Sequence, residues 1–132
     1  MVGQAFESRE HRLTADLGRL REARDFAAAA ADDFGLDEDR SYRARLAMSE
    51  AVANAIQHGS SSASDPIRLV AFEEGGALTF EVIDTGRFVP RVPARGSLPV
   101  RGRGLEFIRE AMDQVEVLPG SGGTTVRFSL QP

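Results

Sequence analysis

The spacing of apolar residues changes partway along this chain, and no other sequence feature constrains its fold as strongly. From residue 16 to residue 59, apolar side chains recur every three or four positions, as at Leu17 and Leu20, which is the period of an amphipathic helix. This spacing predicts a helix over residues 16–34, followed by a glycine of the kind that ends helices. It also predicts a second helix that is capped by Asp37 and ends at Gly59.

Beyond residue 65, apolar residues gather in short runs that are separated by glycine-containing turns, a pattern typical of β-hairpins. Between two such regions, residues 85–103 are dense in glycine and proline, which predicts a long loop. A third helix is expected to begin at Gly104 and to end near Met112. The expected strands cover residues 5–13, 66–72, 78–84, 115–118 and 124–130.

The order of these elements predicts an α+β fold. We expect a two-layer sandwich in which helices cover one face of a mixed, mainly antiparallel sheet. The length of 132 residues fits one domain, so we expect a single domain over residues 1–132.

The composition excludes several classes of function. Because the chain has no cysteine, it can hold neither a disulfide nor a thiolate metal site, and cysteine catalysis is excluded. All 16 basic residues are arginine and the net charge is −4, which argues against direct binding of nucleic acid and against binding to a membrane surface. No segment resembles a membrane span or a secretory signal, so we expect a cytoplasmic protein.

Three polar residues are spaced four apart near the end of the second predicted helix. Glu50, Asn54 and His58 share one helix face, and their neighbours are mostly apolar. The carboxylate, carboxamide and imidazole are therefore set into a half-buried helix, where polar groups need partners. From the helix alone, this pattern fits either a functional site or a solvated face with one core histidine.

Two further segments carry residue types suited to a ligand. Asp84 and Gly86 follow a predicted strand, where a carboxylate can accept a hydrogen bond from an amino group and the glycine lets a flat ring approach. The segment Arg101–Leu105 (RGRGL) precedes a predicted helix, whose N-terminus attracts anions. Each segment taken alone also fits a bland interpretation, as a common turn or as a flexible hinge.

The order and spacing of these segments resemble the GHKL ATPase/kinase superfamily, and within it the small anti-sigma-factor serine/threonine kinases. The resemblance extends from about Leu17 to Leu130 and implies a Bergerat-type ATP-binding fold. It rests on SEAVANAIQHG (49–59), VIDTG (82–86), the glycine lid RGRGLEFIREAMDQVEV (101–117) and GGTTVRF (122–128).

The resemblance implies that ATP and Mg²⁺ bind here and gives roles to residues on the second helix. Asn54 matches the Mg²⁺ ligand of the family, in keeping with the oxygen donors that this cation prefers. Glu50 matches the candidate catalytic base, which would deprotonate an acceptor hydroxyl. His58 lies one turn beyond Asn54, and we expect it to support the phosphate region without being catalytic.

The same resemblance implies an adenine site and a phosphate-covering segment. Asp84 matches the acceptor for the adenine amino group, Gly86 the adjoining glycine, and Thr125 a threonine near the adenine. In the glycine lid, the residues expected to contact the phosphates are Arg101, Gly102, Arg103, Gly104 and Leu105. The family usually reads D-x-G-x-G after the strand, whereas here Phe88 stands in place of the second glycine.

The function that the resemblance implies is partner switching in transcription regulation. Such proteins bind a sigma factor and phosphorylate a STAS-type anti-anti-sigma protein on serine, and related kinases form homodimers. One alternative is a partner-binding module of the same fold with weak or no kinase activity, as the lost glycine suggests. Another is the catalytic domain of a histidine kinase, although no histidine lies in the middle of the first helix.

Overall fold

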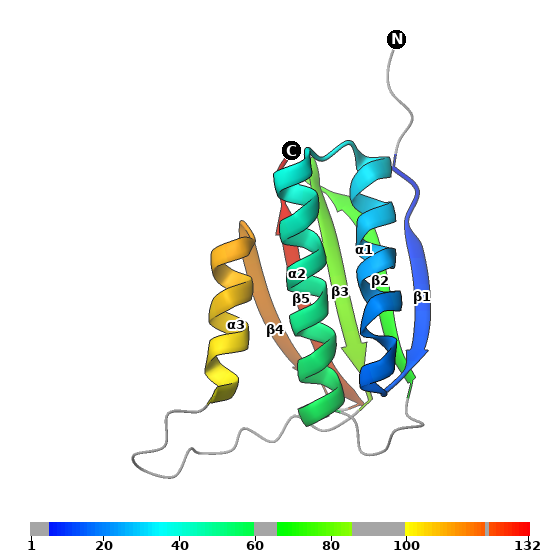
Figure 1. Ribbon diagram of the computed structural model, residues 1–132, viewed down its shortest axis with the longest axis vertical. Coiled ribbons are helices and arrows are strands. Elements are labelled where there is room, and N and C mark those ends of the chain that lie inside the picture. Colours follow the sequence, from blue (N-terminus) through cyan, green and yellow to red (C-terminus); the bar gives the residue numbers. More distant parts are fainter. Residues whose placement is uncertain (1–5, 60–65, 86–99, 121) are drawn as a thin grey trace.

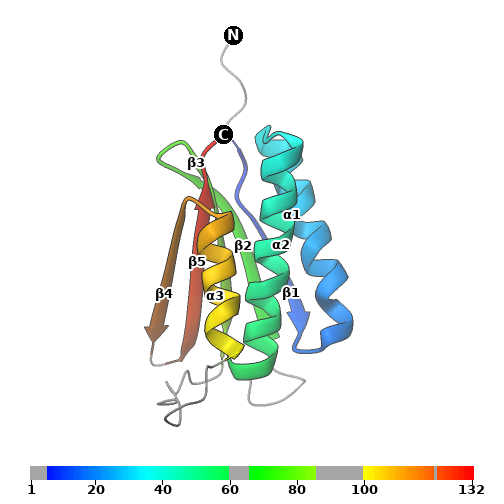
Figure 2. The same ribbon diagram turned by 60° about the vertical axis from the view of Figure 1, so that its left-hand side comes forward.

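The protein folds as an α+β two-layer structure, in agreement with the sequence expectation. The computed structural model describes residues 6–59, 66–85, 100–120 and 122–132. Within these residues, a five-stranded sheet carries its helices on one face (Figures 1 and 2). No described helix is both long enough and apolar enough to cross a membrane.

The first two helices begin and end at residues that the sequence marks. A short 3₁₀ turn, Leu17–Arg19, begins where the Asp16 carboxylate accepts a hydrogen bond from the Gly18 amide at 2.9 Å. It leads into α1 (Leu20–Phe34), and α1 ends at Gly35, whose φ of 94° is the left-handed conformation that favours glycine. Helix α2 (Glu38–Asn54) is capped by Asp37, which accepts a hydrogen bond from the Arg40 amide at 2.8 Å.

The five strands form one sheet in the order β1-β2-β3-β5-β4. Every pairing between the described strands is antiparallel, so the mixed sheet expected from the sequence is fully antiparallel in this part of the chain. The central strand, β3, pairs with β5, which is far from it in sequence, and only the tertiary fold brings the two together. The strands are β1 (Arg9–Thr14), β2 (Pro66–Glu74), β3 (Ala77–Asp84), β4 (Gln114–Gly120) and β5 (Gly123–Leu130).

Strand alternation gives the sheet two different faces. On the face covered by the helices, Phe80 pairs with Phe128 and their rings stack at a centroid distance of 5.5 Å. This face packs against small buried side chains of α1 and α2, among them Ala27 and Ala47, which let the helices approach the sheet closely. The other face, which we call the open face, carries Thr79, Glu81, Arg127 and Ser129.

Helix α3 (Val100–Ala111) begins four residues before Gly104, where the sequence predicted its start. Residues 100–103, expected to be loop, are therefore helical, and both glycines of the RGRGL segment lie within the first turns. Glycine disfavours a helix but does not forbid it, and tertiary packing overrides this preference. Here Ile108 and Met112 are buried in the core and hold the helix against the rest of the molecule.

Candidate functional site

The ends of four elements meet at one end of the molecule. These are the C-terminal ends of α2 and β3 and the N-terminal ends of α3 and β5, which lie together at the bottom of Figure 1 and again in Figure 2. The polar motifs of the sequence fall on these four ends. The fold thus gathers residues that are up to about 70 positions apart, which no local sequence pattern can show.

Helix α2 contributes Glu50 and Asn54, which lie one turn apart on the same face near its C-terminal end. Both residues are partly buried. Among the described residues, neither side chain has a hydrogen-bond or ion-pair partner, whereas the adjacent Ser49 hydroxyl accepts from the Arg24 guanidinium at 3.4 Å. A carboxylate and a carboxamide are therefore available here for a ligand.

A π-helical turn, Ala55–Gly59, follows α2 directly. Such turns are rare, and they often occur at functional sites. The apolar spacing predicts an ordinary α-helix up to Gly59, with His58 one α-turn beyond Asn54, and does not predict this π-turn. A π-turn contains more residues than an α-turn, which shifts His58 around the helix axis. The side chain of His58 lies outside the described part of the structure.

Asp84 is the last residue of β3 and lies opposite Thr124 in the register of β3 and β5. Directly opposed residues of an antiparallel pair point to the same face, here the face that the helices cover. Each residue is only 4% exposed. In the part of the chain that the structure describes, the Thr124 hydroxyl is buried without a hydrogen-bond partner. A buried hydroxyl without a hydrogen bond lowers the stability of the fold unless a ligand or a water molecule bonds to it.

The predicted site residue Thr125 is not brought to this place. It lies opposite Ile83, on the open face of the sheet, while its neighbour Thr124 lies beside Asp84. The register therefore places Thr124, and not the expected Thr125, beside Asp84. Alternation along β5 indicates the same arrangement, because Phe128 and Leu130 are core residues and Thr124 shares their face.

Gly123 fixes the distance between β5 and the end of β3. A Cβ atom at this position would lie 1.8 Å from the Asp84 carbonyl oxygen, and the φ of Gly123 is 151°. Only glycine permits so close an approach with this backbone conformation. The GGTT motif thus serves two purposes, because its second glycine seats the strand beside Asp84 and its first threonine supplies the buried hydroxyl.

The remaining predicted residues lie at the edge of what the structure describes. Gly86 is outside the described residues. The segment Arg101–Leu105 belongs to the first turns of α3, and its side chains are outside the described part.

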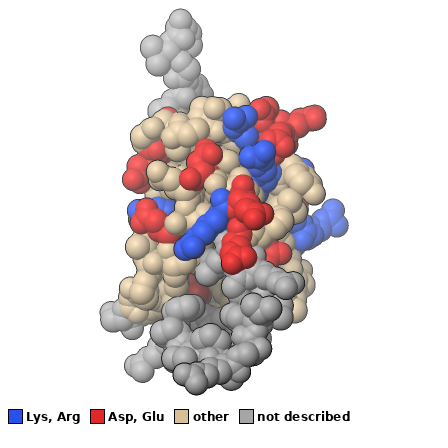
Figure 3. All heavy atoms as spheres, turned by 90° about the vertical axis from the view of Figure 1, so that its left-hand side faces the viewer, with Lys and Arg blue, Asp and Glu red and all other residues tan. Residues whose placement is uncertain are grey.

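No group of three or more histidine, aspartate or glutamate side chains in the described ranges could hold a metal ion by itself. Acidic and basic side chains are mixed on the face that α3 and β4 present (Figure 3).

Comparison with known proteins shows which family this chain resembles. A family model described as a histidine kinase-like ATPase domain matches residues 13–130. Two proteins named anti-sigma F factor, from Thermoanaerobacter sp. (strain X514) and Thermoanaerobacter pseudethanolicus, are each 35% identical over 95 residues. The alignment covers 64% of this chain and 66% of each relative, slightly under two thirds of the relatives' length.

Solved structures with similar folds come from larger proteins. The RsbU and RsbW domains of Rv1364c from Mycobacterium tuberculosis match with a TM-score of 0.73 and 23% identity, over 95% of this chain and 32% of that one. The histidine kinase domain of the blue-light activated histidine kinase from Erythrobacter litoralis EL346 matches with a TM-score of 0.57 and 23% identity, over 89% of this chain and 61% of that one. These likenesses establish the fold.

Proposed function

The chain belongs to the histidine kinase-like ATPase domain family, and we propose that it is an anti-sigma factor that uses ATP to phosphorylate a serine of a STAS-type anti-anti-sigma protein. The observation that carries this proposal is the meeting of Glu50 and Asn54 with the buried Asp84–Thr124 pair at one end of the fold. The likeness to proteins named anti-sigma F factor supports the anti-sigma role.

Asp84 and Thr124 would hold the adenine ring. The Asp84 carboxylate can accept a hydrogen bond from the exocyclic amino group, and the buried Thr124 hydroxyl, which lacks a partner among the described residues, can bond to a ring nitrogen directly or through a water. Gly86 would let the ring lie against the backbone. A buried hydroxyl without a partner, next to a buried carboxylate, is more typical of a binding site for a purine ring than of a packed core.

Glu50, Asn54 and the glycine lid would serve the triphosphate. Asn54 would bind Mg²⁺, which takes few protein ligands and shares the phosphate oxygens, in keeping with the described residues offering no cage of their own. When bound, the metal neutralises phosphate charge. Glu50 would accept the proton of the partner's serine hydroxyl as that oxygen attacks the γ-phosphorus and ADP leaves.

The segment at the start of α3 would cover the phosphates. Backbone N–H groups in the first turn of a helix have no intrahelical partner, so those from the helix start to Gly102 can bind phosphate oxygens. Gly104 and Leu105 follow in the next turn and would lie beside the phosphates as part of the glycine lid. Arg101 and Arg103 would add positive charge. His58, which follows Asn54 in the π-turn, would support the phosphate region without taking part in catalysis.

The proposed partners are a sigma factor and the STAS-type anti-anti-sigma protein, with homodimer formation and a cytoplasmic location as further expectations. Phosphorylation would decide which partner is bound, so the switch would act on transcription without direct contact with nucleic acid. The acceptor serine arrives on another chain, in keeping with the absence of a histidine in the middle of α1.

The role of Glu50 is tested by phosphoryl transfer to the STAS protein encoded near the gene. Glu50→Gln should lower the transfer rate by about 10²- to 10⁴-fold, because a positioned general base contributes about that much. The control Glu38→Gln, at the exposed start of the same helix, should transfer at the wild-type rate. Wild-type transfer by Glu50→Gln would exclude Glu50 as the base.

The role of Asn54 is tested by nucleotide binding with and without Mg²⁺. Asn54→Ala should lose the increase in ATP affinity that Mg²⁺ gives the wild-type protein, measured by calorimetry. Its matched control is Gln57→Ala, on an exposed residue of the following turn. An undiminished Mg²⁺ effect in Asn54→Ala would refute the metal assignment.

A second candidate function is a partner-binding module without phosphoryl transfer. It is favoured by Phe88, which replaces the second glycine of the usual D-x-G-x-G motif. Calorimetry separates the two functions, because a module of this kind would bind the sigma factor yet show no heat of ATP binding at millimolar nucleotide.

A further inference from the structure

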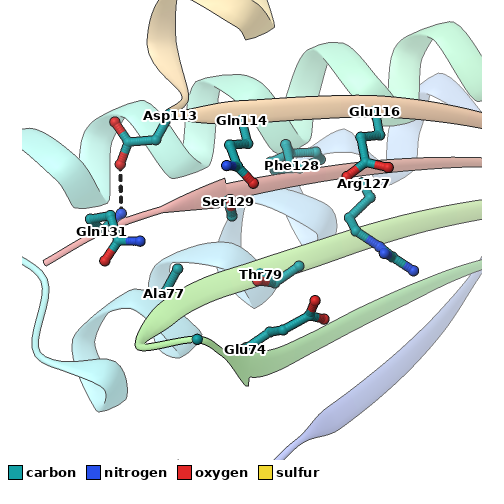
Figure 4. A pocket seen from close by; sticks show the side chains of 11 residues that line it. Glu74, Ala77, Thr79, Asp113, Gln114, Glu116, Arg127, Phe128, Ser129 and Gln131 are labelled. Atoms are coloured by element: carbon teal, nitrogen blue, oxygen red, sulfur yellow. Dashed lines mark hydrogen bonds between the residues drawn. The ribbon is translucent and has the colours of Figure 1, made fainter.

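A second cavity lies on the open face of the sheet, away from the nucleotide site. It has a volume of about 380 Å³ and is formed by the turn between β2 and β3 together with β4 and β5 (Figure 4). Cavities of this size hold a small molecule or a side chain of a partner. Along β3, Asp84 lies seven positions after Ala77, which lines this cavity, so the two sites lie about 20 Å apart and on opposite faces.

The floor of this cavity carries two hydroxyl groups. Thr79 and Ser129 are directly opposed in the register of β3 and β5, and both line the cavity. The two residues are only 4% and 8% exposed, and neither hydroxyl has a hydrogen-bond partner within the described ranges. Of the buried polar side-chain atoms described, only the Thr124 hydroxyl lacks a partner, so the hydroxyls of Thr79 and Ser129 remain accessible from the cavity, where a ligand can use them as donors and acceptors.

The rim of the cavity is acidic. Glu74, Asp113 and Glu116 line it, and all three are exposed. Arg127, the basic residue among those that line the cavity, already forms an ion pair with Glu81 of the neighbouring strand. Its Nη2 and Nε atoms lie 2.7 and 2.8 Å from the same carboxylate oxygen of Glu81. The charge of Arg127 is thus compensated, so the rim as a whole attracts a cation and repels an anion.

We infer that this cavity is a docking site for an arginine side chain of a protein partner. A guanidinium group carries five N–H donors in a planar fork, which matches the two floor hydroxyls and the rim carboxylates, all of which accept hydrogen bonds. One carboxylate oxygen of Asp113 already accepts a hydrogen bond from the backbone N–H of Gln131 at 2.6 Å, and this bond holds the carboxylate at the rim (Figure 4).

The inference is tested by NMR titration with the blocked peptide acetyl-Gly-Arg-Gly-amide. The backbone amides of Thr79, Gln114 and Ser129 should shift and saturate, and raising the salt concentration should weaken binding. The citrulline peptide, which has the same shape without the charge, should bind about tenfold more weakly, because bonds to charged groups are stronger by about 1.4 kcal/mol. Equal affinity for the two peptides would overturn the inference.

Two variants test separately how the floor hydroxyls and the rim carboxylates contribute to peptide binding. Thr79→Val removes a floor hydroxyl at constant volume, and Glu116→Gln removes a rim charge from an exposed residue that the fold does not need. Each should weaken binding of the arginine peptide about threefold to tenfold. Wild-type affinity in Glu116→Gln, whose folding is not at risk, would overturn the inference whatever the fate of Thr79→Val.

A second acidic cavity supplies the matched control. It lies between the end of α1 and the start of α2, has a volume of about 360 Å³, and is lined by Asp32, Asp37 and Glu38. Here Asp37 is already bonded to Arg40 at 2.7 Å. Asp32→Asn should leave peptide binding unchanged, and peptide-induced shifts confined to this cavity would overturn the inference.

Two further outcomes would show that the cavity on the open face binds something other than an arginine side chain of a partner protein. Either outcome would overturn the inference. Tighter binding of spermidine than of the arginine peptide would indicate a free polyamine. Shifts of the Thr79 and Ser129 amides that depend on protein concentration, without peptide, would indicate a second copy of this chain. None of these measurements requires ATP, so their failure is distinguishable from a failure of the proposed kinase function.

Discussion

Gly123 lies where β5 begins, and its backbone packs directly against Asp84. Gly123→Ala should lower the free energy of unfolding by about 3 kcal/mol, because the new Cβ overlaps the Asp84 carbonyl and the positive φ is strained for alanine. Urea unfolding measures this change. The neighbouring Gly122→Ala meets no atom within 4 Å and should stay within about 0.5 kcal/mol of the wild-type protein. Equal unfolding midpoints for the two variants would contradict the close approach.

The two adjacent threonines of β5 should differ sharply in nucleotide binding. Thr124→Val removes a buried hydroxyl beside Asp84, so ATP affinity should fall about fivefold, as for the loss of one hydrogen bond, while stability stays the same or rises. Thr125→Val, on the open face, should leave ATP affinity unchanged. Calorimetry and urea unfolding measure both quantities, and a larger loss in Thr125→Val would reverse the assignment.

At the scale of elements, ionic contacts attach the edge strand β1 to its neighbours. Arg9 pairs with Asp33 of α1 at 2.6 Å, and His11 pairs with Glu22 of the same helix. The hydrogen bond from His11 is the largest cause of the lowered pKa of Glu22. These contacts join β1 to α1 across the covered face, where an edge strand would otherwise have only one neighbour.

On the open face, Arg68 of β2 binds the Glu10 carboxylate of β1 through two hydrogen bonds, of 3.0 and 2.9 Å. The Arg68 guanidinium, with help from Arg12, lowers the pKa of Glu10 from 4.5 to about 2. Because the folded-state pKa lies below the ordinary value, the contact contributes stability above pH 4.5 and loses it as the pH falls toward 2.

The pKa of Glu10 can be measured by following its carboxyl carbon in an NMR titration. The midpoint should lie near pH 2 in the wild-type protein and rise toward 4.5 in Arg68→Met. Arg40→Met, which removes a distant ion pair of α2, serves as the control and should leave the midpoint of Glu10 unchanged. A midpoint near 4.5 in the wild-type protein would show that the Glu10–Arg68 contact does not persist in solution.

At the scale of the whole molecule, the two proposed sites lie at opposite ends of the sheet. ATP with Mg²⁺ should therefore slow amide hydrogen exchange at the end of α2, the end of β3 and the start of β5, because a bound ligand suppresses local opening there. The turn between β2 and β3, at Gly75 and Gly76, should exchange at its ligand-free rate. Protection of this turn alone would place the nucleotide in the wrong part of the molecule.

Most of the helices and strands were predictable from the sequence, because the signals that define them are local. Apolar spacing and the Asp37 and Gly35 caps located α1 and α2, and glycine turns located the hairpins. The motifs also indicated the family. The start of α3 escaped prediction because burial of Ile108 and Met112 outweighs the unfavourable helix propensity of two glycines, and burial is not a local property.

Which residues come into contact depends on how distant strands pair. The pairing of β3 with β5 sets Thr124, and not Thr125, beside Asp84, because a shift of one residue in a strand moves a side chain to the opposite face. The same pairing sets Thr79 beside Ser129 on the open face. Spacing along the chain located the residues that can do chemistry, whereas the register between distant strands decided which of them share a site, since register depends on long-range hydrogen bonds and packing.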